Sequence, residues 1–204
     1  MKFSLAYLIS KASGDSRNVI KTIDCLPNMF DRDIHIVMND RELDIVARNA
    51  IILLTTLVVD DPDEAVDTII HLWYSSLITA SHLRTLQRHI LPIVAEVCDK
   101  ISTKLDGKLL GKTWTYGRTS MRLVLLKEDW SRLLNYLEPP PNLTADRAYA
   151  VRREVTIDPW RVDRRHRSYL GMKPAHRVSR ERFQTDGLLI SFGASRSDFT
   201  IPNP

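Results

Sequence analysis

Residues 3–40 decide the fold that the sequence predicts, and they read FSLAYLISKASGDSRNVIKTIDCLPNMFDRDIHIVMND. The apolar run over residues 3–9 is typical of a strand buried on both faces, as in a parallel sheet. Residues 17–26 carry apolar side chains at helical spacing, and Pro27 ends that helix. A second β-rich run follows at residues 34–38. A strand, a helix and a strand in this order predict a βαβ unit with a right-handed crossover.

Beyond this unit the pattern is mostly helical. Apolar residues recur at three- and four-residue steps, and Asp61-Pro62 has the cap and first-turn chemistry that begin a helix. Three consecutive prolines at residues 139–141 break the chain, because proline cannot continue a helix. We expect helices over residues 42–59, 62–74, 80–105 (bent near Pro92), 127–137 and 144–153, with a third strand over 121–126.

The predicted class is α/β, a helix-rich Rossmann-like sheet of few, mostly parallel strands with a helical C-terminal part. A chain of 204 residues with 44% apolar residues suits one large domain or a domain with an appended subdomain. We expect residues 1–138 to form the Rossmann-like domain with a long helical insertion. Residues 139–204 should form a helical, basic segment packed on it, ending in a strand over 188–192.

The first turn and the end of the second strand are the candidate ligand site. A Rossmann-like site needs glycine after the first strand and an acidic residue after the second, and Gly14 and Asp40 stand in those places. With Asp15 and Asn39 they form the predicted cofactor-binding set. Only one glycine is present in this loop, which favours an adenosyl-type ligand over a nicotinamide dinucleotide. Alternatively, Asp15 and Asp40 merely cap the helices that follow them.

A basic segment is the second candidate. Residues 147–182 contain eleven Lys and Arg against four Asp and Glu, a net +7, which leaves −3 for the rest of a chain whose total is +4. Such a run usually is a solvated helical face that meets an acidic partner or the acidic part of its own chain. Nucleic-acid binding is the alternative, since aromatic rings lie between the cations. The candidate residues are Arg161, Arg164, Arg165 and Arg167, beside Trp160 and Tyr169.

Other chemistry has little support in the sequence. The histidines lack metal-ligand spacing, so we predict no metal, and His71 beside Leu72 and Trp73 is interpreted as a core histidine. No nucleophile elbow or phosphate-binding Walker loop is present, which disfavours a hydrolase or a nucleoside triphosphatase. No apolar stretch approaches the roughly 20 residues that span a bilayer. We therefore expect an intracellular protein, cytoplasmic with the nucleus as the alternative, without membrane contact.

Several motifs together resemble a known family. They are Gly14-Asp15-Ser16-Arg17-Asn18-Val19, His35-Ile36-Val37-Met38-Asn39-Asp40-Arg41, Asp44-Ile45-Val46-Ala47-Arg48-Asn49, His71-Leu72-Trp73-Tyr74-Ser75 and Thr185-Asp186-Gly187-Leu188-Leu189. The chain is similar to an uncharacterised fungal domain family often found beside MYND-type zinc fingers, and to the N-terminal region of axonemal dynein assembly factor three. The resemblance implies a methyltransferase-like fold without an established reaction. Members usually carry a Gly-Cys-Gly-Asp loop where this chain has one glycine, and relatives continue beyond residue 204, which suggests a shortened protein or a fragment.

Three functions follow as hypotheses. The first is a methyltransferase-like domain that is non-catalytic and mediates protein contacts or assembly. The second is a methyltransferase that uses S-adenosylmethionine, held by Gly14, Asp15, Asn39 and Asp40. The third is nucleic-acid binding through the basic segment. Fold class alone cannot choose between them.

Overall fold

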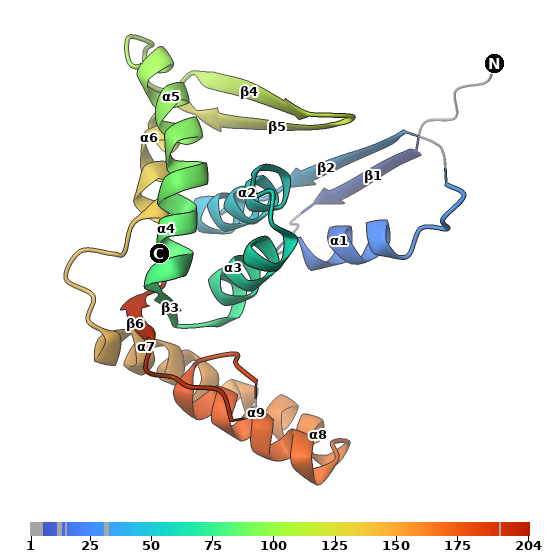
Figure 1. Ribbon diagram of the computed structural model, residues 1–204, viewed down its shortest axis with the longest axis vertical. Coiled ribbons are helices and arrows are strands. Elements are labelled where there is room, and N and C mark those ends of the chain that lie inside the picture. Colours follow the sequence, from blue (N-terminus) through green and yellow to red (C-terminus); the bar gives the residue numbers. More distant parts are fainter. Residues whose placement is uncertain (1–5, 12–13, 15, 31–32, 192) are drawn as a thin grey trace. The chain divides into compact units, whose positions relative to one another are not determined.

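The computed structural model describes residues 6–11, 14, 16–30, 33–191 and 193–204 (Figure 1). Helices make up more than half of these described residues. By its internal contacts the chain divides into two units, residues 1–51 and residues 52–204. Among the described residues, no helix combines the length and apolar character needed to cross a membrane.

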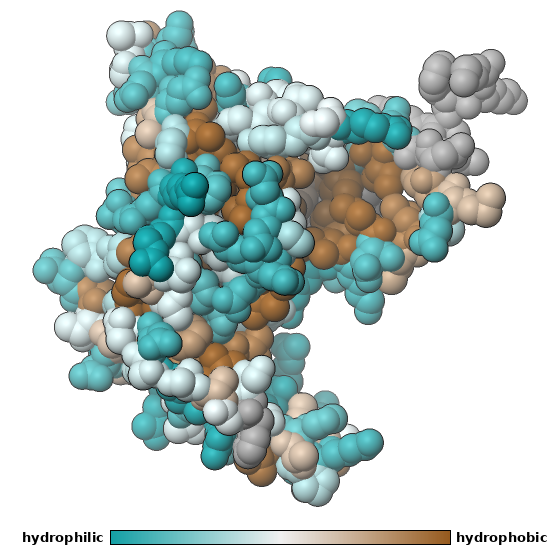
Figure 2. Space-filling model, in the orientation of Figure 1, coloured by the Kyte–Doolittle hydropathy of each residue, from teal (hydrophilic) through white to brown (hydrophobic). Residues whose placement is uncertain are grey.

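The first unit contains the predicted βαβ arrangement, which is confirmed. Strand β1 (Ala6–Lys11) pairs in parallel with β2 (Ile34–Asn39), and helix α1 (Arg17–Asp24) connects them. The early turns of α2 (Leu43–Val58) belong to this unit, and the rest lies in the second. Figure 2 shows apolar surface in the region of α1 and β2, where Ile20, Ile23 and Val37 are exposed. A two-stranded sheet has little stability of its own, so this unit depends on the helices that pack with it.

The second unit begins with the end of α2 and with helix α3 (Pro62–Tyr74). The Asp61 carboxylate accepts a hydrogen bond from the Asp63 N–H, and Pro62 occupies the first turn, as the sequence predicts. A short strand β3 (Leu77–Thr79) leads into the next helical segment. Helix α3 and the segment that follows it carry the polar cluster described below.

The predicted helix over residues 80–105 is found as three consecutive pieces. These are α4 (Ala80–Thr85), one turn of π-helix η1 (Leu86–Ile90) and α5 (Leu91–Ile101). The π-turn lies immediately before Pro92, at the expected irregularity. Proline has no N–H to donate to the preceding turn and its ring crowds that turn, which accounts for the interruption.

An antiparallel hairpin follows. Strand β4 (Leu109–Tyr116) pairs with β5 (Thr119–Leu126) around a turn at Gly117, whose φ of 56° suits glycine. Helix α6 (Lys127–Leu133) and the 3-10 turn η2 (Leu134–Leu137) come next. The fully buried Trp130 anchors them, since its indole N–H donates to the Leu110 carbonyl at 3.0 Å.

The C-terminal part consists of three helices and a returning strand. Its elements are α7 (Ala145–Ile157), the 3-10 turn η3 (Pro159–Arg161), α8 (Val162–Leu170), α9 (Pro174–Asp186) and β6 (Phe199–Pro202). Strand β6 pairs antiparallel with β3, which joins residues that are far apart in the sequence. Buried Leu77, Ala148 and Leu188 form a small core that holds α7 against this ladder. The strand expected over residues 188–192 is not found in its described part, and β6 lies further along the chain.

The predicted fold class is wrong. The described residues form three separate two-stranded sheets, of which only β1–β2 is parallel, not one Rossmann-like, methyltransferase-like sheet of mostly parallel strands. The run at residues 121–126 is indeed a strand, but a tight turn joins it to β4, and a two-residue turn permits only antiparallel pairing. The predicted division between residues 138 and 139 stays a prediction.

Candidate functional site

The predicted cofactor loop makes a compact set of hydrogen bonds within the first unit. The Gly14 N–H donates to Asp40 Oδ2 at 2.9 Å, and the Glu42 N–H donates to Asp40 Oδ1 at 3.1 Å. These N–H groups, Gly14 first, lower the pKa of the Asp40 carboxyl because they favour its charged form. The Arg48 guanidinium in turn donates to the Gly14 carbonyl at 2.9 Å.

Both oxygens of Asp40 thus accept backbone N–H groups, one of them from the turn that precedes α2. This arrangement fits the alternative in which Asp40 organises its own loop. Asn39 ends β2 opposite Lys11 with its side chain exposed, and Asp15 lies outside the described residues. A Rossmann ligand lies against the carboxyl ends of several parallel strands, and one parallel pair offers no such crevice. The cofactor role of these residues stays a prediction.

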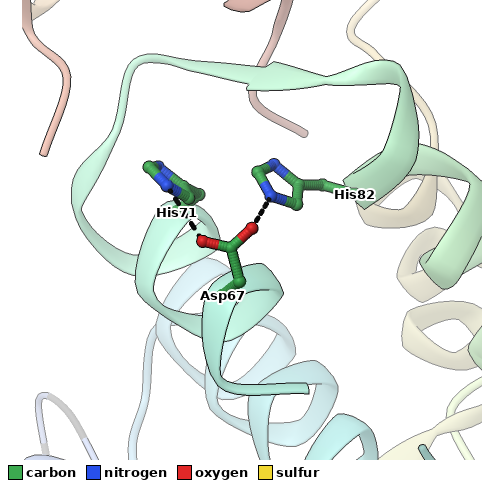
Figure 3. Close-up of side chains that lie close together, drawn as sticks. All are labelled: Asp67, His71 and His82. Atoms are coloured by element: carbon green, nitrogen blue, oxygen red, sulfur yellow. Dashed lines mark hydrogen bonds and ion pairs between the residues drawn. The ribbon is translucent and has the colours of Figure 1, made fainter. Parts of the chain in front are cut away.

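A polar cluster that the sequence analysis missed lies in the second unit (Figure 3). Asp67 and His71 are one helical turn apart on α3, and His82 comes from α4. The Asp67 carboxylate lies 2.7 Å from His82 Nε2 and 3.5 Å from His71 Nε2, through different oxygens. The two imidazoles stack with ring centroids 4.8 Å apart. Both histidine side chains are almost fully buried, at 6% and 5% exposure, whereas Asp67 is 65% exposed.

A neighbouring backbone N–H fixes the tautomer of neutral His82, and a hydroxyl lies beside His71. The Thr79 N–H donates to His82 Nδ1 at 3.2 Å as part of a capping box at the start of α4, so the proton of a neutral His82 resides on Nε2 and faces Asp67. His71 Nδ1 lies 2.8 Å from the Ser75 hydroxyl. Burial, and then the proximity of His82, lower the pKa of His71, while Asp67 opposes them.

The C-terminal end of the described chain closes over this cluster. The Phe199 ring packs 4.7 Å from His71 and 6.1 Å from His82, measured between centroids. The Asn203 amide lies within hydrogen-bond distance of three carbonyls at the end of α3, those of His71, Leu72 and Ser75, at 2.7 to 3.1 Å. A helix end leaves its last carbonyls without partners, so Asn203 caps α3 from a distant part of the sequence.

The chemistry open to the cluster is limited. Ser75, His71 and Asp67 have the composition of an acyl-transfer triad, but Ser75 is buried and its hydroxyl also accepts the Leu189 N–H at 3.2 Å. Two imidazoles and a carboxylate are also ligands that zinc prefers. Coordination through Nε2 would move the His82 proton to Nδ1, against the Thr79 N–H. The hydrogen bonds therefore favour a structural polar cluster, for which the Asp67–His71 spacing of four residues was the available signal.

The predicted basic residues lie on the segment that we call the arm, residues 145–186. Arg161, Arg164 and Arg167 are exposed, whereas Arg165 is half-buried and faces inward with Tyr169. The structure thus separates one of the four predicted arginines from the other three. Helices α8 and α9 are described in full, and none of their side chains is fully buried.

Large apolar side chains are nevertheless exposed on the arm. Trp160 is 74% exposed and Leu170 is 80% exposed, and Val178 on α9 is also exposed. The Arg161 guanidinium lies over the Trp160 ring, 5.2 Å from its centroid. Aromatic, aliphatic and arginine side chains together are the residue types that protein interfaces favour.

Comparison with known proteins gives one family match. Residues 4–78 match a family described as a domain of unknown function (DUF4470). The matched span includes Gly14, Asp40, Asp67 and His71 and ends before His82. The match shows no link to MYND-type zinc fingers or to a dynein assembly factor. No curated protein and no solved structure matches the chain.

Proposed function

We propose that this chain is a non-catalytic protein-interaction module, which binds an acidic partner protein through the exposed side of the arm. The carrying observation is that α8 and α9, described in full, bury no side chain completely while they expose apolar residues among arginines. Exposed apolar surface between cations is costly in water and is a usual mark of an interaction site. The cytoplasmic location expected from the sequence belongs to this proposal.

Charge supports an acidic partner. The +7 net charge of residues 147–182 is concentrated on a segment whose own acidic residues are few. Opposite charge on a partner would speed association and fix its orientation, and the apolar side chains would supply affinity. The resemblance of the sequence to a protein assembly factor agrees with this role.

Nucleic acid fits the arm less well. Phosphates would pair with the arginines, but Leu170 and Val178 have no counterpart on a phosphate backbone. Base stacking requires open aromatic faces, and the Arg161 guanidinium lies over one of the two faces of the Trp160 ring. The Tyr169 hydroxyl donates to Glu181, so this tyrosine is tied to α9.

The test uses the full chain and a fluorescein-labelled peptide with alternating glutamate and leucine, measured by fluorescence anisotropy. We expect saturable binding that weakens roughly tenfold in Trp160→Ala or Leu170→Ala, since exposed anchors of this kind dominate interface energetics. An alanine at Val66, which is exposed on α3 and is not part of the arm, serves as the control and should leave binding unchanged. Binding that depends on net charge alone, or tighter and steeply salt-dependent binding of a labelled RNA or DNA 20-mer, would overturn the proposal in favour of the nucleic-acid alternative.

A further inference from the structure

A hollow of about 320 Å³ lies between α7, α8 and α9 within the arm. Its walls include Arg153 from α7, Arg165, His166 and Tyr169 from α8, and Glu181 and Gln184 from α9. It is therefore bounded by all three helices of the arm. Cationic side chains outnumber acidic ones on these walls, since Glu181 is the one carboxylate among the lining residues.

The two arginines that line this hollow have no partner among the described residues. Neither the Arg153 nor the Arg165 guanidinium makes a hydrogen bond or an ion pair with any residue that the structure describes. By contrast, Arg147 forms an ion pair with Glu154, and Arg152 donates to the Phe183 carbonyl. Unpaired guanidinium groups at a partly enclosed site favour a negatively charged ligand, because desolvation strengthens the attraction between opposite charges.

Arg180 of α9 does not line the hollow, but its charge acts on Tyr169, which does. The Nε atom of Arg180 is buried and has no hydrogen-bond partner. The charges of Arg180 and Arg165 both act to lower the pKa of the Tyr169 hydroxyl, although burial and Glu181 raise it overall, so both guanidinium groups lie near this ring. The Tyr169 oxygen also lies 2.8 Å from the Gln184 amide, which fixes the tyrosine as a wall of the hollow.

We infer that this hollow binds an oxyanion, either the carboxylate of an acidic side chain or the phosphoryl group of a phosphorylated one. Planar guanidinium groups bind both anions through paired N–H donors. The inference rests on the proposed function, because the anion would belong to the acidic partner that binds the arm. It assigns to Arg153 and Arg165 a specific role that Arg164 and Arg167, which do not line the hollow, do not share.

The arm offers a matched control for the test. Arg153→Gln with Arg165→Gln removes two charges from the hollow, and Arg164→Gln with Arg167→Gln removes two charges from the exposed side of α8. The full chain and both double variants are titrated with the glutamate–leucine peptide, with a version that carries one phosphoserine, and with a version in which glutamine replaces glutamate. We expect the first double variant to bind the charged peptides at least tenfold more weakly and the second no more than about threefold.

Three outcomes separate the inference from the proposed function. Equal losses in the two double variants would overturn the oxyanion site and leave acidic-partner binding intact. If the Arg153→Gln, Arg165→Gln variant loses more affinity for the phosphoserine peptide than for the glutamate–leucine peptide, the anion is the phosphoryl group. If it loses the same affinity for both peptides, the anion is the carboxylate. If no peptide binds, the proposed function fails.

A second measurement does not depend on the variants folding. Inorganic phosphate is added to the unsubstituted, isotope-labelled chain, and nuclear magnetic resonance shifts are followed. Saturable shifts confined to His166, Tyr169 and their neighbours support the site even without peptide binding. Shifts spread over all arginine-rich segments, or no shifts at millimolar phosphate, overturn it.

Discussion

Replacement of Leu188 by alanine tests how the arm is held to the rest of the second unit. Leu188 lies just beyond the end of α9 and is 2% exposed. It packs with Leu77 of β3 and Ala148 of α7, so the three side chains connect these elements. Leucine-to-alanine changes at buried sites cost about 2–5 kcal/mol, because a cavity adds to the lost transfer free energy. This core is small and its other neighbours are only partly buried, so it can partly collapse. We therefore expect the lower part of that range, about 2–3 kcal/mol.

Leu189 provides the matched control, since the same substitution there affects a side chain that is 39% exposed. Leu189→Ala keeps the N–H that donates to Ser75 and should cost no more than about 0.5–1 kcal/mol. In thermal unfolding followed by circular dichroism, Leu188→Ala should lower Tm by roughly 5–10 °C. Amide hydrogen exchange should accelerate first around Ala148 on α7. Equal Tm shifts in the two variants, or unchanged exchange in α7, would refute the assignment of Leu188 as the anchor.

Three other predictions concern pH and backbone. Burial lowers the pKa of His71, so below pH 6.5 the unfolded chain binds more protons than the folded chain does. The midpoint of urea unfolding should therefore fall as the pH drops below 6.5, and it should fall less steeply in His71→Gln. Gly187→Ala places a Cβ 2.5 Å from the Ser76 hydroxyl at a φ of 69°, whereas Gly193→Ala, at a φ of 83°, meets no described atom within 4 Å. Both alanines are strained by the left-handed backbone, so the difference between the two variants isolates the contact with Ser76. Calorimetry should show that Gly187→Ala lowers the free energy of unfolding by about 1–3 kcal/mol more than Gly193→Ala does. Asp40→Ala should destabilise the chain at neutral pH. Because the pKa of Asp40 is lower in the folded chain, its contribution to stability is fully present above pH 3.8 and is lost as the pH falls through the folded-state pKa. Chemical denaturation should therefore show the difference between the variant and the unsubstituted chain shrinking below pH 3.8.

Local structure was predictable because its causes are local. The helix start at Asp61-Pro62 and the irregularity before Pro92 follow from side chains within one turn. Pairing of strands was not predictable in the same way. The sequence of β6 has no pattern that indicates pairing with β3. The hydropathy of β4 alternates too weakly to indicate a hairpin with β5. The prediction of a single sheet was wrong because strand pairing depends on contacts between residues that are distant in the sequence.

The candidate sites divide in the same way. The charge of the arm could be counted in the sequence, but the inward position of Arg165 depends on how α8 packs with its neighbours. His71 could be assigned to the core from its apolar surroundings. Its stacking with His82 could not, because the two rings come from different helices and meet only when the chain turns at β3.

The ladder between β3 and β6 has a consequence for how the chain could be divided. It pairs Leu77 with Pro202. The Ser76 N–H and hydroxyl also donate to the Gly187 carbonyl, and the Ser76 carbonyl accepts the Asn203 N–H. The segment between these residues is therefore a loop closed at its base without a covalent link. A protease cut near the exposed residues Pro141 and Asn142 would therefore leave two fragments that remain associated. Separately expressed pieces, one ending there and one beginning there, should reassemble when mixed. The chain is in this sense a natural candidate for fragment complementation, with the pieces held by a short ladder, one leucine and an asparagine.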